Sequence, residues 1–163
     1  FLGRWMKHGV YPVKLLRLFR YGAARCEQRH MDEHMELSRG RAVEFEHDFV
    51  DENLNGLGWW AHKHVDYSAR ELADLEDILS SAAADSGING QAERKRAMKE
   101  RYARQPLFWR SFAYFCYRYF LKLGFLDGRE GFLWHFMQGW WYRTLVDARQ
   151  FEKQKKGSGK TAR

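Results

Sequence analysis

Two aromatic-rich stretches separated by a polar break constrain the fold of the last third of this chain. The first covers residues 106–126, and Pro106 stands where a helix can start. The break, Asp127-Gly128-Arg129-Glu130, has the Asp-x-x-Glu spacing of a helix capping box, and aromatic residues continue beyond it to Val146. The sequence therefore predicts an amphipathic, aromatic helical hairpin over residues 106–152.

The first aromatic stretch is not expected to span a membrane, because basic residues interrupt it. Arg110, Tyr114, Arg118 and Lys122 follow one another at four-residue spacings, so they fall on one side of a helix. A basic stripe of this kind suits a membrane surface that carries negative charge. The alternative is a hairpin that only packs on a neighbouring domain.

Strand patterns precede one long helical pattern in the first half of the chain. Residues 13–20 form an apolar run broken by basic residues and bounded by Pro12 and Gly22, and residues 41–47 alternate loosely. Both patterns favour short strands. Over residues 57–84, apolar side chains recur at helical spacing. We therefore expect an α/β chain with a few short strands near the N-terminus and mostly α-helix after them.

The remaining segments are polar. Residues 85–105 are expected to form a loop and a highly charged helix, to which we assign no chemistry. Residues 153–163 form a basic Gly/Ser-containing tail that is expected to be disordered. The tail ends in Gly-Ser-Gly-Lys-Thr, but it lacks the earlier glycine and the following helix of a phosphate-binding loop.

Composition narrows the class of protein. A chain with 45% hydrophobic and 17% aromatic residues is too rich in buriable side chains to be disordered. Its net charge of +7 favours an anionic partner such as phosphate, nucleic acid or an acidic lipid surface. No nucleic-acid motif is recognisable, so a nucleic-acid partner is not expected. Cys26 and Cys116 stand far apart, which predicts neither a disulfide framework nor a thiolate zinc site and favours a reducing compartment.

An acid-and-histidine cluster, His30-Met31-Asp32-Glu33-His34, is the first candidate for chemistry. It is not a zinc-protease helix, because Met31 stands where that motif needs Glu. A carboxylate here can act as a base if it is held against a hydroxyl group, and a solvated acidic turn is the alternative. His47 is a candidate metal ligand or a structural histidine.

A second constellation lies on the helix predicted over residues 57–84. One stripe of that helix carries Trp60, His64, Tyr67 and Glu71. Lys63, Asp66 and Arg70 lie beside it. Such a stripe is typical of a sugar or phosphate site, and it is also typical of the edge of a core with surface ion pairs.

The order of motifs along the chain resembles the C-terminal half of bacterial family-two glycosyltransferases, in the branch that builds lipopolysaccharide core and exopolysaccharide. The matching segments are Gly3-Arg4-Trp5, Tyr11-Pro12, Leu16-Arg17-Leu18-Phe19-Arg20, His30-Met31-Asp32-Glu33-His34, His47, Lys63-His64 with Tyr67 and Arg70-Glu71, and Gly124-Phe125-Leu126-Asp127-Gly128-Arg129-Glu130-Gly131-Phe132. The resemblance extends from Phe1 to about Glu152. Its last segment is the most distinctive.

The resemblance implies a GT-A fold and inverting transfer of a sugar from a nucleotide-sugar donor to a glycan or lipid-linked acceptor. It implies that the donor-binding half, with an Asp-x-Asp metal motif, lies upstream of Phe1, so residues 1–84 would belong to the acceptor side and this chain alone would be inactive. The catalytic base would be Glu33, with Asp32 as the alternative. His47 would join the ligands of a divalent metal, Mg²⁺ or Mn²⁺.

The same resemblance assigns substrate contacts and a location. Arg17, Arg20, His64, Tyr67 and Arg70 would face the diphosphate or a phosphorylated acceptor. The protein would be cytoplasmic and peripheral on the inner face of the plasma membrane. The alternative function is a non-catalytic, basic and aromatic module that binds a membrane surface.

Overall fold

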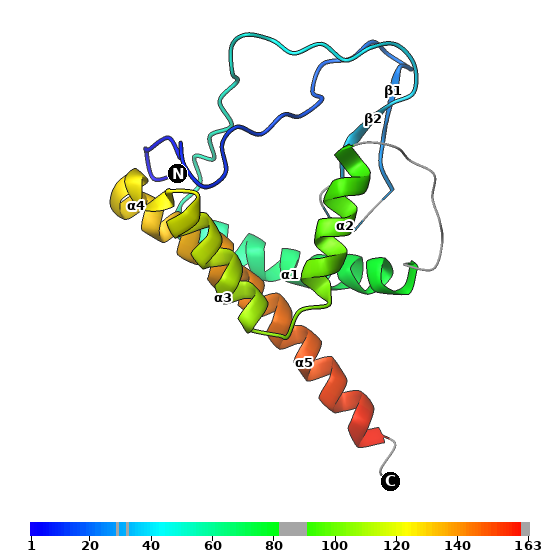
Figure 1. Ribbon diagram of the computed structural model, residues 1–163, viewed down its shortest axis with the longest axis vertical. Coiled ribbons are helices and arrows are strands. Elements are labelled where there is room, and N and C mark those ends of the chain that lie inside the picture. Colours follow the sequence, from blue (N-terminus) through cyan, green and yellow to red (C-terminus); the bar gives the residue numbers. More distant parts are fainter. Residues whose placement is uncertain (29, 32, 82–90, 161–163) are drawn as a thin grey trace.

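A computed structural model describes residues 1–28, 30–31, 33–81 and 91–160, and most of them are helical. Figure 1 shows a helical body joined to a small β-ribbon by two extended arms, which we define as residues 10–22 and 38–56. The expected order of a few short strands followed by helices is confirmed.

The ribbon consists of β1 (Ala24–Cys26) and β2 (Met35–Leu37), which pair antiparallel with Arg25 opposite Glu36. The strands expected at residues 13–20 and 41–47 were wrong, because both segments are extended but carry no regular structure. A strand needs a neighbour for its backbone N–H and C=O groups. The two arms meet instead through side chains: the Tyr11 hydroxyl donates to Asp48 at 2.8 Å, and Lys14 Nζ donates to Glu44 at 2.6 Å.

The long predicted helix is α1 (Leu57–Ser81); its expected end near residue 84 and the loop that follows lie outside the described residues. α1 packs on α5 (Tyr142–Lys160) and on the charged helix α2 (Gln91–Ala103). The apolar core of this junction is small. It consists of Leu75, Ala103, Tyr142 and Val146.

The aromatic stretches form two antiparallel helical limbs (Figure 1). The first limb is α3 (Trp109–Cys116), continued by the π-helical turn η1 (Tyr117–Leu121). A 3₁₀ turn, η2 (Gly124–Asp127), makes the corner. The second limb runs without a break through α4 (Gly128–Trp134), the π-helical η3 (His135–Trp141) and α5. The basic tail expected to be disordered from residue 153 is therefore helical as far as Lys160.

The two arginines of the basic stripe face inward, and only Lys122, at its end, is exposed. Arg110 and Arg118 are buried, with 3% and 4% of their surface exposed. Arg110 Nε donates to Asp147 Oδ1 of α5 at 2.7 Å, and the Arg118 guanidinium lies over the ring of Tyr114. A buried guanidinium is tolerated when an acid or an aromatic face compensates it, so the interior between the limbs combines ion pairs with aromatic contacts such as that of Phe115 with Trp140.

Candidate functional site

The predicted catalytic base, Glu33, is exposed in the turn between β1 and β2; Asp32 lies outside the described residues. Both histidines of that turn approach other acids. His30 Nε2 lies 3.2 Å from Asp77 Oδ2 of α1, and His34 Nδ1 lies 3.6 Å from Glu27 Oε2. The turn therefore leans against the C-terminal part of α1 and leaves Glu33 open to solvent.

The other residues predicted in the first half of the chain lie on the arms. Arg17 and Arg20 are exposed on the first arm, and His47 is exposed on the second. Over the part of the chain that the structure describes, no three His, Cys, Asp or Glu side chains come together as a metal site. A single imidazole is too few ligands for Mg²⁺ or Mn²⁺, so a metal at His47 needs further ligands from elsewhere.

His64 does not face solvent, although the sequence suggested a substrate contact. Its ring stacks on Trp60 with centroids 3.5 Å apart, and its Nδ1 donates to the Trp60 carbonyl at 2.8 Å. The edge of the Tyr142 ring closes the other side. Burial lowers the pKa of His64, which favours the neutral ring. His64 thus joins α1 to α5 and is not available to a phosphate in this conformation.

Tyr67 and Arg70, in contrast, lie with two further side chains on the outer side of α1. Lys63 Nζ stands 4.9 Å from the ring centroid of Trp59 and 5.1 Å from that of Tyr67. The Arg70 guanidinium lies 5.8 Å from the same Tyr67 ring. We call Trp59, Lys63, Tyr67 and Arg70 the Tyr67 face. Its aromatic rings can stack on a sugar, and its two cations can bind a phosphate.

The sequence pointed to Tyr67 and Arg70 but missed Trp59, and it gave Lys63 no role. Trp59, Lys63 and Tyr67 follow one another at four-residue spacing, so they lie in one row along the helix. That spacing was the available signal. The neighbouring Trp60 fits the apolar stripe of the same helix, which makes the row of Trp59 less apparent in the sequence.

The acidic residues of the α1 stripe are used for packing. Lys99 Nζ of α2 lies 3.1 Å from Glu71 Oε1 and 2.7 Å from Asp74 Oδ2. Arg143 of α5 approaches Glu71 at 4.0 Å, and its guanidinium also lies over the ring of Tyr102. Glu71 and Asp74 are both buried. They hold three helices together and are not exposed to a substrate.

The distinctive segment 124–132 forms the corner of the hairpin. Asp127 makes no helix cap, so the predicted capping box was wrong. Its buried carboxylate instead accepts the backbone N–H and the ring Nδ1–H of His8, each at 2.8 Å. The next N–H, that of Gly9, donates to the Lys122 carbonyl at 3.0 Å. The N-terminal segment is thereby fastened to the corner.

The side chain of His135 packs against the segment that these hydrogen bonds join, between Gly9 and Gly124. A Cβ added to Gly9 would lie 2.2 Å from its Cε1, and one added to Gly124 would lie 2.3 Å from its Nε2, so only glycine fits at both positions. The ring is fully buried. Burial, helped by the charge of Arg118, lowers the pKa of His135 to about 4. The corner is thus a packed joint built around a neutral imidazole.

Comparisons with protein-family models, with curated proteins and with solved structures found no match for this chain. Within the described residues, no helix combines the length and the apolar character needed to cross a bilayer.

Proposed function

We propose that this chain is the acceptor-side half of a glycosyltransferase, which transfers a sugar from a nucleotide-sugar donor to a cell-envelope glycan or glycolipid. The observation that carries the proposal is the ordered set of motifs that ends in segment 124–132. That segment is distinctive for a physical reason, because Gly124 and Asp127 are each required by a close contact at the corner. A motif with such requirements is a better marker of shared architecture than an acid-rich turn.

The two arms expose many apolar side chains, which supports the proposal that another domain packs on them. Among the described residues up to Gly56, only Met6 and Ala23 are buried. Val13, Leu18, Val43, Phe45, Val50 and Leu54 are among those that expose more than half of their surface. So many exposed apolar side chains on two adjoining segments favour a surface that another domain covers. A donor-binding domain packed on the arms would cover it.

The proposed reaction is an inverting displacement. The acceptor hydroxyl oxygen forms the new bond to the anomeric carbon while the bond from that carbon to the nucleoside diphosphate breaks. Glu33 takes the hydroxyl proton, as its open position in the β1–β2 turn permits. His47 would be one ligand of a divalent metal held mainly by the donor-binding half, and such a metal would supply positive charge to the departing diphosphate. The Tyr67 face would hold a sugar ring or a phosphate, with Arg17 and Arg20 of the first arm as further cations.

The test is sugar transfer by the complete gene product that contains these residues. Membranes and lipid extracts serve as acceptors, and a panel of radiolabelled nucleotide sugars serves as donors. We expect Glu33→Gln to lower kcat by roughly a hundredfold or more, because removal of a general base has an effect of that order. Glu52→Gln, which changes an equally exposed glutamate of the second arm, is the matched control.

Two results would count against the proposal in different ways. Full transfer by Glu33→Gln would show that Glu33 is not the catalytic base, but the protein would still be a glycosyltransferase. Absence of transfer from every donor in the panel would remove the reaction class.

A second candidate function is a non-catalytic module that binds a membrane surface. The observation that favours it is the group of exposed aromatic and leucine side chains at the corner of the hairpin. Vesicle binding by a gene product that transfers no sugar would select this function over the first.

A further inference from the structure

The corner of the hairpin exposes a cluster of apolar side chains, which we call the corner surface. Its members are Phe120, Leu121, Leu123, Phe125, Leu126, Phe132 and Leu133. Leu121 exposes 75% of its surface and Leu126 exposes 51%, so these side chains are not the half-covered edge of a core. They come from three consecutive elements, η1, η2 and α4, which turn around one point (Figure 1).

The corner surface is rigid, unlike an exposed loop. Beneath it lie the His8–Asp127 hydrogen bonds and the ring of His135, which is packed between two glycines. The backbone that carries the apolar side chains is therefore held in place by these contacts. A preorganised apolar surface loses little conformational entropy when it docks.

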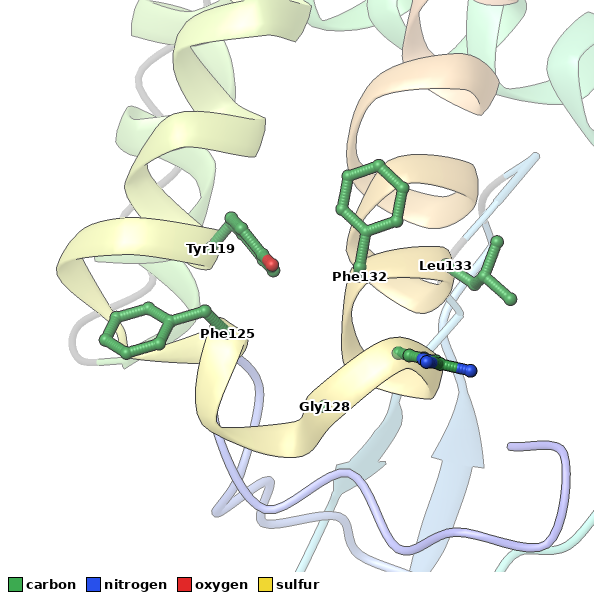
Figure 2. Close-up of a pocket in the computed structure, with 6 residues that line it drawn as sticks. Tyr119, Phe125, Gly128, Phe132 and Leu133 are labelled. Carbon is green, nitrogen blue, oxygen red and sulfur yellow. The ribbon is translucent and has the colours of Figure 1, made fainter.

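An open groove of about 560 Å³ runs through the corner surface. Figure 2 shows Tyr119 and Phe125 on the first limb and Phe132 facing them from α4, with Leu133 on the far side of that helix and the backbone turning at Gly128. Arg129 also lines the groove, so a cation stands beside an apolar channel. This combination matches the chemistry of a phospholipid, in which an anionic phosphate adjoins apolar chains.

The charges around the corner surface are mostly positive. Lys122 and Arg129 are exposed within it. Arg4 reaches it from the N-terminal segment, because Arg4 NH1 lies 3.7 Å from Glu130 Oε2. Glu130, which is half-buried, is the one acid on α4, and the nearby Asp127 carboxylate is buried and bound to His8.

An amphipathic anchor adjoins these charges. Trp5 exposes 58% of its surface, and Lys7 Nζ lies 4.9 Å from the centroid of its ring. His8, the next residue, is fastened to the corner, so Trp5 and Lys7 belong to the same end of the molecule. Tryptophan with a neighbouring lysine is typical of the water–lipid boundary.

We propose that the corner surface docks on an anionic phospholipid bilayer. Its leucine and phenylalanine side chains enter the boundary between headgroups and acyl chains, and Lys122 and Arg129 bind lipid phosphates. The positive charge favours an anionic bilayer, because exposed cations beside an apolar patch match lipid phosphates that adjoin acyl chains. The proposal does not depend on sugar transfer, and it differs from the membrane contact expected from the sequence, since Arg110 and Arg118 take no part.

The experiment is co-sedimentation of the purified protein with vesicles of phosphatidylcholine, with and without phosphatidylglycerol. We expect binding that requires the anionic lipid and weakens as salt is added. The double variant Leu121→Glu, Leu126→Glu should bind at least about tenfold more weakly, because two apolar contacts become two repelled charges. Lys122→Gln and Arg129→Gln should each weaken binding about fivefold.

Leu54→Glu is the matched control, since Leu54 exposes 88% of its surface on the second arm, outside the corner surface. Its binding should equal that of the unaltered protein. Equal binding by the double corner variant, or failure of the unaltered protein to sediment with anionic vesicles, would overturn the proposal. Circular dichroism checks the fold of each variant.

If the double variant does not fold, quenching of tryptophan fluorescence by brominated acyl chains in the unaltered protein decides the question, with quenching expected. Sugar transfer to a water-soluble acceptor separates this proposal from the previous one, because docking can fail while transfer persists.

Discussion

Asp127 accepts two hydrogen bonds from His8, a residue 119 positions earlier in the chain, with donor–acceptor distances of 2.8 Å for both the backbone N–H and the ring Nδ1–H. The carboxylate is buried, so these two donors, and not water, satisfy it. One side chain thus connects the N-terminal segment to the corner of the hairpin, and its removal should affect both.

Asp127→Ala should lower the free energy of unfolding by about 2–3 kcal/mol, because it leaves the partly buried N–H of His8 without an acceptor. Asp48→Ala is the control, since Asp48 accepts a single exposed hydrogen bond from Tyr11. The control should cost less than about 1 kcal/mol. Urea denaturation measures both variants. Equal costs would mean that the His8 contact adds nothing to stability.

Gly124→Ala should destabilise the protein by about 1–3 kcal/mol, the range found for overpacked sites. The added Cβ would lie 2.3 Å from His135 Nε2 and 3.0 Å from the Arg118 carbonyl oxygen. Gly58→Ala in α1 is the opposite case, because nothing lies within 4 Å of its added Cβ. This change should stabilise the helix by about 0.5–1 kcal/mol. Thermal unfolding should therefore shift in opposite directions for the two glycines.

Stability should fall as the pH falls from about 6.5 to about 4. His135 has an ordinary pKa near 6.5 in the unfolded chain and a pKa of about 4 in the folded protein. Between these two pH values, His135 binds a proton in the unfolded state but stays neutral in the folded state, so acid favours unfolding. The full effect is on the order of 3 kcal/mol, and it levels off below pH 4.

The variant His135→Phe isolates this effect, because it keeps an aromatic ring between the two glycines and cannot take up the proton. The loss of stability between pH 6.5 and pH 4 should become smaller than in the unaltered protein. His64, whose pKa is also lowered by burial, contributes in the same direction in both proteins and cancels from the comparison. His62→Phe, at an exposed position of α1, should keep the original pH dependence.

Arg110→Met should cost about 3–5 kcal/mol, because it leaves the carboxylate of Asp147 buried without its charge partner. Asp147 also accepts the N–H of Phe108 at 2.7 Å, and Phe108 has a φ of 68°, a left-handed conformation that disfavours a bulky residue. Loss of the ion pair should therefore loosen the start of α3 as well.

The double variant Arg110→Met, Asp147→Asn should recover part of this loss, since no unpaired charge remains. Urea denaturation gives the two free energies, and hydrogen exchange of the α3 amides reports the local loosening. A double variant no more stable than Arg110→Met would contradict the pairing.

Arg70 and His64 should behave differently when each is changed to Ala. Arg70 is exposed on the Tyr67 face, so Arg70→Ala should raise the KM for a phosphorylated substrate about tenfold and leave stability within about 0.5 kcal/mol. His64→Ala should cost about 2–4 kcal/mol through its lost contacts with Trp60 and Tyr142. Transfer kinetics and thermal unfolding together distinguish the two roles, and a stability defect in Arg70→Ala would speak against a substrate contact.

The sequence predicted where helices form better than it predicted which side of a helix faces the interior. The helical spacing of apolar residues located α1, although between Trp60 and Leu75 the helix buries His64, Ser68, Glu71 and Asp74 together with the two apolar side chains. The four-residue spacing of Arg110, Tyr114 and Arg118 located a stripe as well, but this spacing is the same whether the stripe faces water or the interior. Arg110 faces the interior because it pairs with Asp147 of another helix, and no local sequence pattern near Arg110 indicates this partner.

The predicted strands and the capping box failed for a related reason. Residues 13–20 have strand-like composition, yet a strand also requires a partner with free backbone groups. Asp127 has the spacing of a helix cap, yet its carboxylate is taken by His8 from the other end of the chain. Of the predicted site residues, Tyr67 and Arg70 lie together because they share one helix, whereas Glu33 and His47 are on separate segments whose placement depends on long-range contacts.

The contacts between the two limbs of the hairpin bear on the solvents in which the hairpin is stable. Its limbs are joined through ion pairs, hydrogen bonds and stacked rings, such as Arg110 with Asp147 and Phe115 with Trp140, more than by the expulsion of water from aliphatic side chains. Contacts of this kind do not weaken when the surroundings become less aqueous. We therefore expect the hairpin to keep its internal geometry both in water and at the boundary of a lipid bilayer.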